Sequence, residues 1–158
     1  MDDRYFPLFI SLKGKKILVV GGGRIAQGRI ETLLRFQADI TVISPEFTQK
    51  ISEWGEQGSI LLREKYYQED DLGHFYMVLA TTNDPQVNVQ VVKQCRSRGI
   101  LVNDASDQKQ CDFFFPAIIE EDGLVFGVTS GGRNHRKVKE VCAAVREFLF
   151  ARREQEMT

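Results

Sequence analysis

The fold of this 158-residue chain is indicated by one stretch, Lys16-Ile17-Leu18-Val19-Val20-Gly21-Gly22-Gly23-Arg24-Ile25-Ala26. Ile17 to Val20 is a short, uninterrupted and partly β-branched apolar run, which is typical of a parallel strand buried on both faces. Gly21, Gly23 and Ala26 complete the pattern G-x-G-x-x-A, in which the first glycine permits a tight turn and the second lets a pyrophosphate approach the backbone. The pattern predicts a dinucleotide at a helix N-terminus, where free N–H groups and the helix dipole favour negative charge.

Strands and helices alternate after this stretch. Apolar runs and helical periodicity predict strands at 17–20, 39–45, 60–62, 75–80 and 100–103. They predict helices at 24–37 and 85–98, and a helix from residue 47 that ends at either Gly55 or Gly58. Such alternation indicates an α/β fold, a Rossmann-type doubly wound parallel sheet that binds its ligand at the carboxyl ends of the strands. We therefore expect residues 1–112 to form an NAD-binding domain, with the apolar lead-in at 5–10 against the edge of the sheet.

The pattern changes after residue 112. The apolar stretch 113–119, the turn 120–123 and the run 124–129 predict a β-hairpin. A final helix carries an apolar stripe of Val138, Val141, Cys142, Val145 and Leu149. Because a hairpin and one helix are too small to bury a core of useful size, residues 113–158 are predicted to be a dimerisation region, and the chain a homodimer.

Composition limits the partners and the compartment. The net charge of −1 creates no overall field that would attract nucleic acid or a membrane surface, and no apolar run approaches the ~20 residues that span a bilayer. The three cysteines form no C-x-x-C pair, and neither histidine has a His or Cys at metal-ligand spacing. We expect a cytoplasmic protein without a metal site that binds neither nucleic acid nor membranes.

Polar residues at the carboxyl ends of the predicted strands are candidate ligand contacts. Ser44 or Glu46 could hydrogen-bond the adenosine ribose, and no arginine cluster awaits a 2′-phosphate there, which favours NAD over NADP. Thr81 follows the fourth strand, where a ligand contact and a capping role are both open. Asp104 and Asp107 follow the fifth strand, where their carboxylates either transfer protons or are simply solvated.

A basic segment follows the glycine pair Gly131-Gly132. Residues 133–139 read Arg-Asn-His-Arg-Lys-Val-Lys, with four fixed positive charges and no acid. Two interpretations remain open at this point. The segment is either a solvated helix face or a docking site for a polyanionic small molecule beside the dinucleotide.

Several separated motifs then occur in one order from about residue 5 to residue 150. They are Tyr5-Phe6-Pro7-Leu8-Phe9, Leu18-Val19-Val20-Gly21-Gly22-Gly23, Ala80-Thr81-Thr82-Asn83-Asp84-Pro85 with Asn88, Gly99-Ile100-Leu101-Val102-Asn103, Cys111-Asp112-Phe113 with Pro116-Ala117-Ile118, and Ser130-Gly131-Gly132. In these motifs the chain resembles the precorrin-2 dehydrogenase family, which includes the N-terminal domain of siroheme synthase. The resemblance implies NAD-dependent oxidation of precorrin-2 to sirohydrochlorin in siroheme biosynthesis, and some members also insert ferrous iron.

The resemblance also implies roles for particular residues. The implied cofactor contacts are Gly21, Gly22, Gly23, Arg24, Ile25, Ser44, Pro45, Glu46, Thr81, Thr82 and Asn103. The tetrapyrrole carries eight carboxylates that need cationic neighbours. The implied substrate contacts are Ser130, Arg133, His135, Arg136 and Lys137.

The chain departs from the family in three places. The family's catalytic aspartate lies three residues after an asparagine, where this chain has Ser106; the candidate catalytic residues are therefore Asp104, Ser106 and Asp107. The family's Gly-Gly-x-Ser-Pro appears as Gly131-Gly132-Arg133-Asn134-His135, and only one helix represents its helical C-terminal domain. Two hypotheses follow: a precorrin-2 dehydrogenase, with ferrochelatase activity as an extension, or a non-catalytic relative that binds NAD or a tetrapyrrole as a sensor or subunit.

Overall fold

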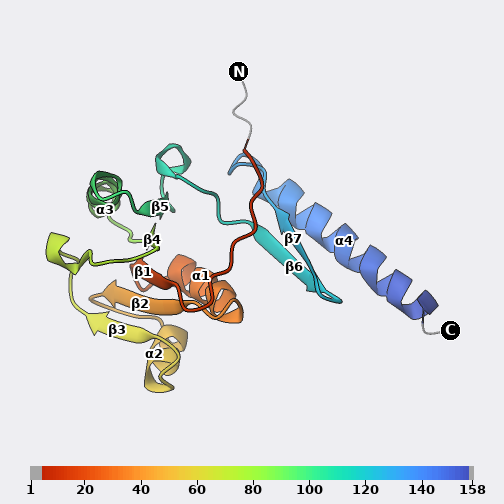
Figure 1. Cartoon of the computed structure of the whole chain (residues 1–158), viewed down its shortest axis with the longest axis horizontal. Helices are drawn as coiled ribbons and strands as arrows, with labels where there is room; N and C mark the ends of the chain where they lie inside the picture. Colours follow the sequence, from red (N-terminus) through yellow and green to blue (C-terminus); the bar gives the residue numbers. More distant parts are fainter. Residues whose placement is uncertain (1–4, 157–158) are drawn as a thin grey trace. The chain divides into compact units, whose positions relative to one another are not determined.

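The structure is a computed structural model that describes residues 5–156 (Figure 1). The described chain divides into two compact units. One unit is continuous, from Phe9 to Phe113, and the other combines residues 5–8 with residues 114–156.

A five-stranded parallel sheet forms the first unit. Its strands are β1 (Lys16–Val20), β2 (Asp39–Ser44), β3 (Leu61–Glu64), β4 (Met77–Ala80) and β5 (Leu101–Asp104), in the order β3-β2-β1-β4-β5. The connections contain α1 (Arg24–Arg35), α2 (Gln49–Glu56), α3 (Pro85–Ser97) and the short 3₁₀ turns η1 (Glu69–Asp71) and η2 (Gln108–Gln110). This order confirms the prediction of a Rossmann-type doubly wound sheet.

The direction of winding reverses between β1 and β4. The chain runs outward from β1 to β2 and β3, and then returns to the other side of β1 to build β4 and β5. Because parallel crossovers are right-handed, α1 and α2 cover one face of the sheet and α3 covers the other. Ligands of such sheets bind outside the carboxyl ends of the strands at this reversal, which here is the edge that holds Gly21 and Thr81.

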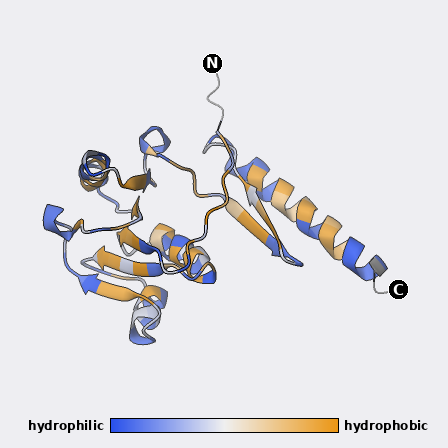
Figure 2. Ribbon diagram, viewed as in Figure 1, coloured by the Kyte–Doolittle hydropathy of each residue, from blue (hydrophilic) through white to orange (hydrophobic). Residues whose placement is uncertain are grey.

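The core lies in the central strands. Ile17, Leu18 and Val19 of β1 and Val78 and Leu79 of β4 are fully buried, and Figure 2 shows orange segments along the sheet. Each such side chain contributes ~1.5–3 kcal/mol by leaving water. Continuous apolar runs rather than alternating ones follow from burial on both faces, as the sequence indicates.

Local signals fix the ends of the helices. The carboxylate of Asp84 accepts a hydrogen bond of 2.8 Å from the N–H of Gln86, and Pro85 is the first residue of α3. Gly99 has φ +67° just after α3, a conformation that glycine adopts without strain. The first helix ends at Arg35, two residues before its predicted end, because Gln37 turns into the left-handed region with φ 58°.

The second unit consists of a hairpin and a long helix. Strand β6 (Ala117–Glu121) pairs antiparallel with β7 (Leu124–Val128) through a two-residue turn, Asp122-Gly123, in which both residues have positive φ. Helix α4 (His135–Glu156) packs on β6. Among the described residues of this unit, the buried apolar side chains are Ile119 and Cys142. The predicted hairpin and helix are therefore confirmed, and their shared core is small.

The lead-in corrects one expectation. The ring of Tyr5 meets the ring of Phe114 edge to face, with 4.5 Å between centroids, and residues 5–8 belong to the second unit. The prediction that the lead-in at 5–10 lies against the edge of the parallel sheet is wrong for residues 5–8, because the contact of Tyr5 with Phe114 packs them in the second unit. Within residues 5–156, no helix is both long enough and apolar enough to cross a membrane.

Candidate functional site

Gly21 forms a tight turn at the end of β1. Its φ is +117°, and a Cβ at this position would lie 2.7 Å from the Oγ1 of Thr81. The N–H of Gly21 donates to the carbonyl of Ile43 at 2.8 Å, while the N–H and the hydroxyl of Thr81 both donate to the carbonyl of Val20. These hydrogen bonds hold the ends of β1, β2 and β4 together around Gly21, which has no side chain.

Gly22 holds the loop that follows β2. A Cβ on Gly22 would overlap the backbone oxygen of Glu46 and would lie 3.0 Å from the Cβ of Ser44. The carbonyl of Gly22 accepts a hydrogen bond of 2.9 Å from the N–H of Thr48. Sequence reasoning gave separate roles only to Gly21 and Gly23, and the run of three glycines was the signal for this close approach.

Gly23 is open on the side where a cofactor would lie. A Cβ there would meet nothing within 4 Å, and Gly23 is the N-cap of α1, so no side chain occupies the helix N-terminus. Ala26, in the first turn of α1, is fully buried. Free N–H groups, the helix dipole and an unobstructed backbone fit the pyrophosphate of a dinucleotide.

The remaining predicted cofactor residues lie around this turn. Ser44 is buried at the end of β2, and Pro45 and Glu46 are exposed after it. Arg24 and Ile25 are exposed in the first turn of α1. Thr81 is buried and Thr82 is half-buried after β4. The sheet therefore brings the glycine turn and the ends of β2 and β4 to one edge.

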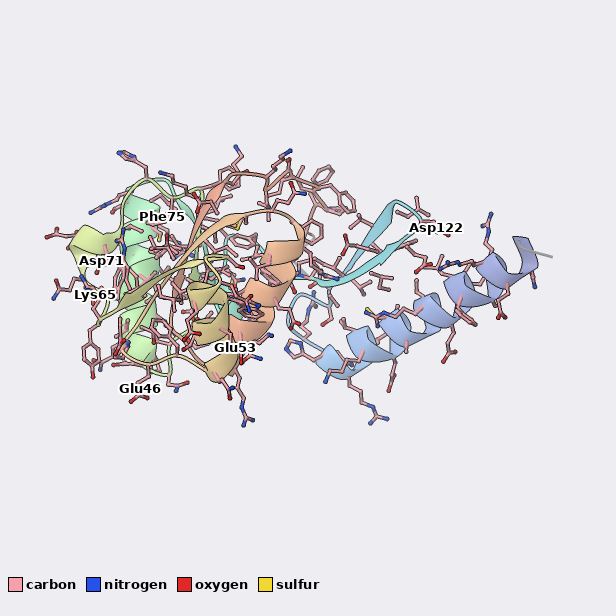
Figure 3. The ribbon with its side chains drawn as sticks, turned by 90° about the horizontal axis from the view of Figure 1, so that it is seen from below. Glu46, Glu53, Lys65, Asp71, Phe75 and Asp122 are labelled. Carbon is pink, nitrogen blue, oxygen red and sulfur yellow. The ribbon has the colours of Figure 1, made fainter. Side chains whose placement is uncertain are left out.

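A lysine follows β3, and an acidic residue pairs with it. The N–H of Lys65 donates to the carbonyl of Ser44, and its Nζ lies 2.8 Å from Oδ1 of Asp71 (Figure 3). Burial alone would raise the pKa of Asp71, but the hydrogen bonds from Lys65 and the N–H of Gln68, with the charges of Lys65 and Arg63, outweigh burial and lower it. The ammonium group of Lys65 is therefore already paired.

Asp104 ends β5 inside the protein. It is only 3% exposed, and β4 places Ala80 beside it. Its Oδ1 accepts hydrogen bonds from the N–H of Ser106 at 2.8 Å, the hydroxyl of Ser106 at 2.6 Å and the N–H of Asp107 at 3.3 Å. Its Oδ2 is buried without a hydrogen-bond partner among the described residues.

Ser106 and Asp107 are exposed on the loop after β5. Asp107 caps η2, since its carboxylate accepts a hydrogen bond of 2.9 Å from the N–H of Lys109. The hydroxyl of Ser106 links Asp104 to Asn88 of α3, whose Nδ2 lies 3.1 Å from it. Of the three catalytic candidates, Ser106 and Asp107 are accessible from solvent and Asp104 is not.

Asn88 is a residue whose structural role sequence reasoning missed. It is fully buried, and its Oδ1 accepts from the N–H of Thr82 at 3.1 Å and from the hydroxyl of Thr82 at 2.7 Å. Its Nδ2 donates to the carbonyl of Thr82 and to Ser106. One side chain thus joins the loops that follow β4 and β5.

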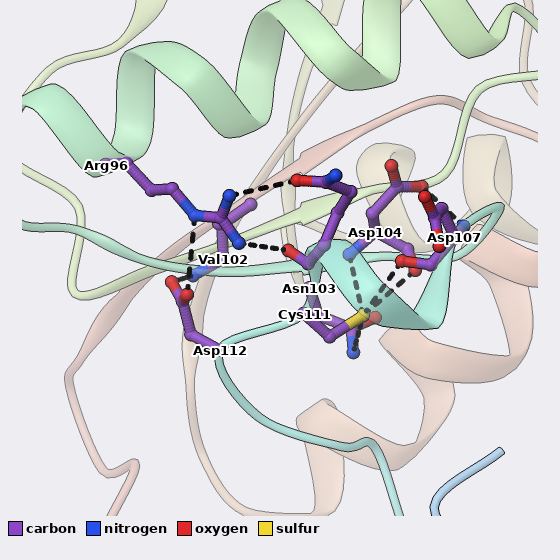
Figure 4. A network of polar contacts seen from close by, with 8 residues as sticks. Arg96, Val102, Asn103, Asp104, Asp107, Cys111 and Asp112 are labelled. Carbon is purple, nitrogen blue, oxygen red and sulfur yellow. Dashed lines mark hydrogen bonds and ion pairs between the residues drawn. The ribbon is translucent and has the colours of Figure 1, made fainter.

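Asn103 lies in a second polar network (Figure 4). Its Oδ1 accepts a hydrogen bond from the guanidinium of Arg29, and its Nδ2 donates to the carbonyl of Phe113 at 2.7 Å. Burial lowers the pKa of Arg29, and the nearby Cys111 and Asp104 act in the opposite direction. Sequence reasoning missed Arg29, because a single arginine on a helix gives no signal of a partner beyond it.

The thiol of Cys111 is packed against the same strand end. Its Sγ accepts from the N–H of Asp104 at 3.3 Å and donates to the carbonyl of Asp104 at 3.1 Å. Burial raises the pKa of this thiol, and the hydrogen bonding at Asp104 reduces the effect. The thiol therefore serves to fix the loop in its protonated form.

The segment after η2 closes the free edge of the sheet. The N–H of Asp112 donates to the carbonyl of Val102 at 2.9 Å, and its Oδ2 accepts from the N–H of Val102 at 3.0 Å. Arg96 of α3 lies 3.7 Å from the other carboxylate oxygen of Asp112 (Figure 4). The edge strand β5 is thus covered, which protects it from pairing with other chains.

The predicted substrate residues lie in the second unit. Arg133, His135, Arg136 and Lys137 are exposed where α4 begins. The hydroxyl of Ser130 accepts a hydrogen bond of 2.8 Å from the N–H of Asn134, and the Oδ1 of Asn134 caps α4 through the N–H of Lys137. Arg136 pairs with the exposed Glu140 one turn later. Within residues 5–156, no group of three or more His, Cys, Asp or Glu side chains is placed to hold a metal ion.

Known proteins are similar to this chain in sequence. The family model described as "Putative NAD(P)-binding" matches residues 8–117. The "Probable multifunctional siroheme biosynthesis protein HemA" of Ruminiclostridium josui is 45% identical over 144 residues, which are 90% of this chain and 28% of that protein. The siroheme synthase of Nitrosococcus oceani is 33% identical over 129 residues, which are 82% of this chain and 28% of that protein.

A solved structure is also similar to this chain. The structure of SirC, precorrin-2 dehydrogenase, superposes with a TM-score of 0.78 at 30% identity, over 90% of this chain and 70% of that one. This chain spans only 28% of the length of the HemA protein and of the siroheme synthase. The match extends over 90% of this chain, and it confirms the resemblance seen in the sequence motifs. The chain therefore belongs to the precorrin-2 dehydrogenase and siroheme synthase N-terminal domain family.

Proposed function

We propose that this protein oxidises precorrin-2 to sirohydrochlorin with NAD in siroheme biosynthesis. The observation that carries the proposal is the open N-terminus of α1, where Gly23 leaves the backbone bare beside the crowded Gly21 and Gly22. The similarity to SirC, precorrin-2 dehydrogenase, supports the reaction. When bound, the nicotinamide ring accepts the hydride, and this chain's residues orient the reactants and accept the proton.

The cofactor residues divide into three groups. Gly21, Gly22, Gly23, Arg24 and Ile25 would hold the pyrophosphate at the start of α1. Ser44, Pro45 and Glu46 would border the adenosine, and Thr81, Thr82 and Asn103 would line the nicotinamide half. The support for these roles is that all three groups lie at the carboxyl edge of one sheet, near the reversal between β1 and β4.

The preferred cofactor is NAD rather than NADP. The exposed carboxylate of Glu46 follows β2, where it can accept hydrogen bonds from the ribose diol and would repel a 2′-phosphate. The nearby Lys65 is held by Asp71 at 2.8 Å and so is not free to bind a phosphate. Calorimetric titration with each dinucleotide should give a lower Kd for NAD than for NADP. The variant Glu46→Gln should bring these two Kd values closer together.

The substrate residues are proposed from charge. Ser130, Arg133, His135, Arg136 and Lys137 would bind carboxylates of the tetrapyrrole, and three of the five carry fixed positive charges on exposed side chains. The proton acceptor of the reaction is sought among Asp104, Ser106 and Asp107. Ferrochelatase activity remains a separate extension, to be tested by adding ferrous iron to the product.

A homodimer completes the proposal. We assign the unit from Phe9 to Phe113 to the cofactor and residues 114–156 to dimerisation. The hairpin and α4 expose large apolar side chains, among them Leu124, Phe148 and Phe150, each more than half exposed. A second copy would bury this surface. The three cysteines form no disulfide, which supports a reducing cytoplasm as the compartment.

One assay separates an enzyme from a sensor or subunit. Purified protein is mixed with precorrin-2 and NAD, and the formation of sirohydrochlorin is followed while NAD binding is measured by calorimetry. Turnover that depends on both protein and NAD supports the dehydrogenase. NAD binding without turnover would favour the non-catalytic relative.

A further inference from the structure

Ser106 and Asp104 are hydrogen-bonded to each other but differ in exposure. The hydroxyl of Ser106 donates to Oδ1 of Asp104 at 2.6 Å. Asp104 is 3% exposed, whereas Ser106 lies on the surface of the loop after β5. The serine hydroxyl therefore connects the buried carboxylate to the protein surface by a hydrogen bond.

The neighbours of Ser106 fix the direction of its hydrogen bonds. The N–H of Thr82 can only donate, so the side-chain atom of Asn88 that faces it is the oxygen, and the Nδ2 of Asn88 must face Ser106. A hydroxyl has one proton to donate and two lone pairs. The proton goes to Asp104 and one lone pair goes to Asn88, which leaves one lone pair of Ser106 for a proton from outside.

The carboxylate of Asp104 is the acceptor at the buried end of this hydrogen-bond chain. Its Oδ1 accepts three hydrogen bonds, which stabilise the carboxylate, while its Oδ2 is buried without a partner among the described residues. A buried polar oxygen without a hydrogen-bond partner is unusual in folded proteins, and it leaves Oδ2 as an open acceptor site. Arg29, which interacts electrostatically with Asp104, stabilises the carboxylate before the proton arrives.

The pair lies at the same edge of the sheet as the glycine turn. Asp104 stands beside Ala80 of β4, and the N–H of Ala105 donates to the carbonyl of Ala80 at 2.9 Å. The next residue, Thr81, contacts Gly21. A substrate that delivers a hydride to a dinucleotide bound at this edge would therefore lie within reach of the loop that holds Ser106.

We propose that Ser106 and Asp104 form a two-residue proton relay that takes the place of a single surface carboxylate. The inference rests on the proposed dehydrogenation. Oxidation removes one hydride and one proton from the substrate: the hydride goes to the nicotinamide, the proton goes to Oγ of Ser106, and the hydroxyl proton of Ser106 passes to Asp104. Ser106 is the catalytic residue, and Asp104 acts through it.

Single substitutions give the first test. Ser106→Ala and Asp104→Asn should each lower kcat by about 10²–10⁴-fold, the usual contribution of a general base, with the Kd for NAD unchanged. Ser59→Ala, at an exposed turn, is the matched control and should keep the wild-type rate. An Ser106→Ala variant whose kcat stays within threefold of wild type would overturn the relay, and because Ser106 is exposed this variant should fold.

The double variant Asp104→Asn/Ser106→Asp gives the decisive test. It places a carboxylate at the surface position and removes the buried one, so kcat should recover to within about tenfold of wild type. In heavy water, the wild-type protein should show a larger solvent isotope effect on kcat than the double variant, because the hydroxyl proton of Ser106 moves only in the wild-type protein.

A double variant no faster than Asp104→Asn would contradict the relay, because a purely structural Asp104 gives no reason for rescue. A solvent isotope effect on kcat of equal size in the wild-type protein and the double variant would contradict it as well. A wild-type protein that binds NAD but does not oxidise precorrin-2 refutes the proposed function and the relay together. Wild-type turnover with an unaffected Ser106→Ala variant refutes the relay alone.

Discussion

The Nδ2 of Asn88 lies 3.1 Å from the Oγ of Ser106, so a fully buried amide of α3 holds the loop that follows β5. The same amide makes three hydrogen bonds to Thr82 in the loop that follows β4. These loops supply the proposed nicotinamide contacts and the proposed relay, so Asn88 positions both without touching either reactant.

Replacement of Asn88 should therefore cost much stability. Asn88→Ala removes four hydrogen bonds and leaves the N–H of Thr82 without its acceptor, which should lower the free energy of unfolding by roughly 2–4 kcal/mol in urea denaturation. Asn83→Ala, on the exposed start of the same connection, should change it by less than about 0.5 kcal/mol. Equal stability of the two variants would contradict the role given to Asn88.

The glycine turn allows a comparison between two adjacent positions. Gly22→Ala places a methyl group against the backbone oxygen of Glu46, so the variant should lose stability together with dinucleotide binding. Gly23→Ala meets nothing within 4 Å and should fold normally, yet it should weaken NAD binding because the methyl group occupies the open side of the turn.

Gly28→Ala provides the control for both glycine variants. Gly28 lies within α1 and is exposed, and a Cβ there also meets nothing within 4 Å. The substitution should raise the free energy of unfolding by about 0.5–1 kcal/mol without changing the Kd for NAD. If Gly23→Ala binds NAD as tightly as Gly28→Ala does, the proposed position of the pyrophosphate is wrong.

The pair of Lys65 and Asp71 predicts a pH dependence. The pKa of Asp71 in the folded protein is below its ordinary value of 3.8, so the pair stabilises the fold above that pH and the contribution is lost as the pH falls through the folded value. Asp71→Asn should reduce the free energy of unfolding by roughly 1–2 kcal/mol at pH 7, because Lys65 is partly exposed. Urea denaturation at a series of pH values should show that the difference in free energy of unfolding between the wild-type protein and Asp71→Asn becomes smaller only at acidic pH.

Asp70→Asn is the matched control for the same turn. Asp70 is exposed in η1, and its substitution should leave stability nearly unchanged at all these pH values. Because Asp71→Asn also releases Lys65 beside the end of β2, it should tighten binding of NADP more than binding of NAD. A stability difference that persists undiminished at the lowest pH would show that the Asp71 charge is not its source.

The apolar surface of the second unit predicts a self-association interface. Phe148 of α4 is 65% exposed, and Figure 2 shows apolar segments along the length of this helix. Phe148→Glu should convert a dimer to a monomer in sedimentation-velocity experiments, because a carboxylate would be buried without a partner. Val89→Glu, at a side chain of α3 that is 55% exposed, should leave the dimer intact. A wild-type protein that sediments as a monomer would refute the dimer.

Much of the fold could be predicted from the sequence, because buried parallel strands leave a strong signal. The run Ile17–Val20 has no polar residue, and Asp84-Pro85 marks the start of α3. The errors lie at element ends. Strand β4 begins at Met77 rather than at residue 75, since the N–H of Phe75 is turned toward the carbonyl of Gly73 instead of joining the ladder.

The site was less predictable, because its contacts join distant residues. Arg29 reaches Asn103 across 74 positions, and Asn88 reaches Ser106 across 18. Neither pair lies at a spacing that a helix or a strand would reveal, since parallel crossovers bring the residues together. Asp104 and Asp107 look equivalent in the sequence, and only their burial separates them.

The proposed dehydrogenase activity can be measured by the oxidation of precorrin-2 itself. Purified protein, precorrin-2 and NAD are combined without added metal, and NADH and sirohydrochlorin are quantified in the same sample over time. The two products should appear at equal rates and in equal amounts, and NADP should support a slower reaction. Tight binding of NAD with neither product formed would contradict the proposed dehydrogenase activity.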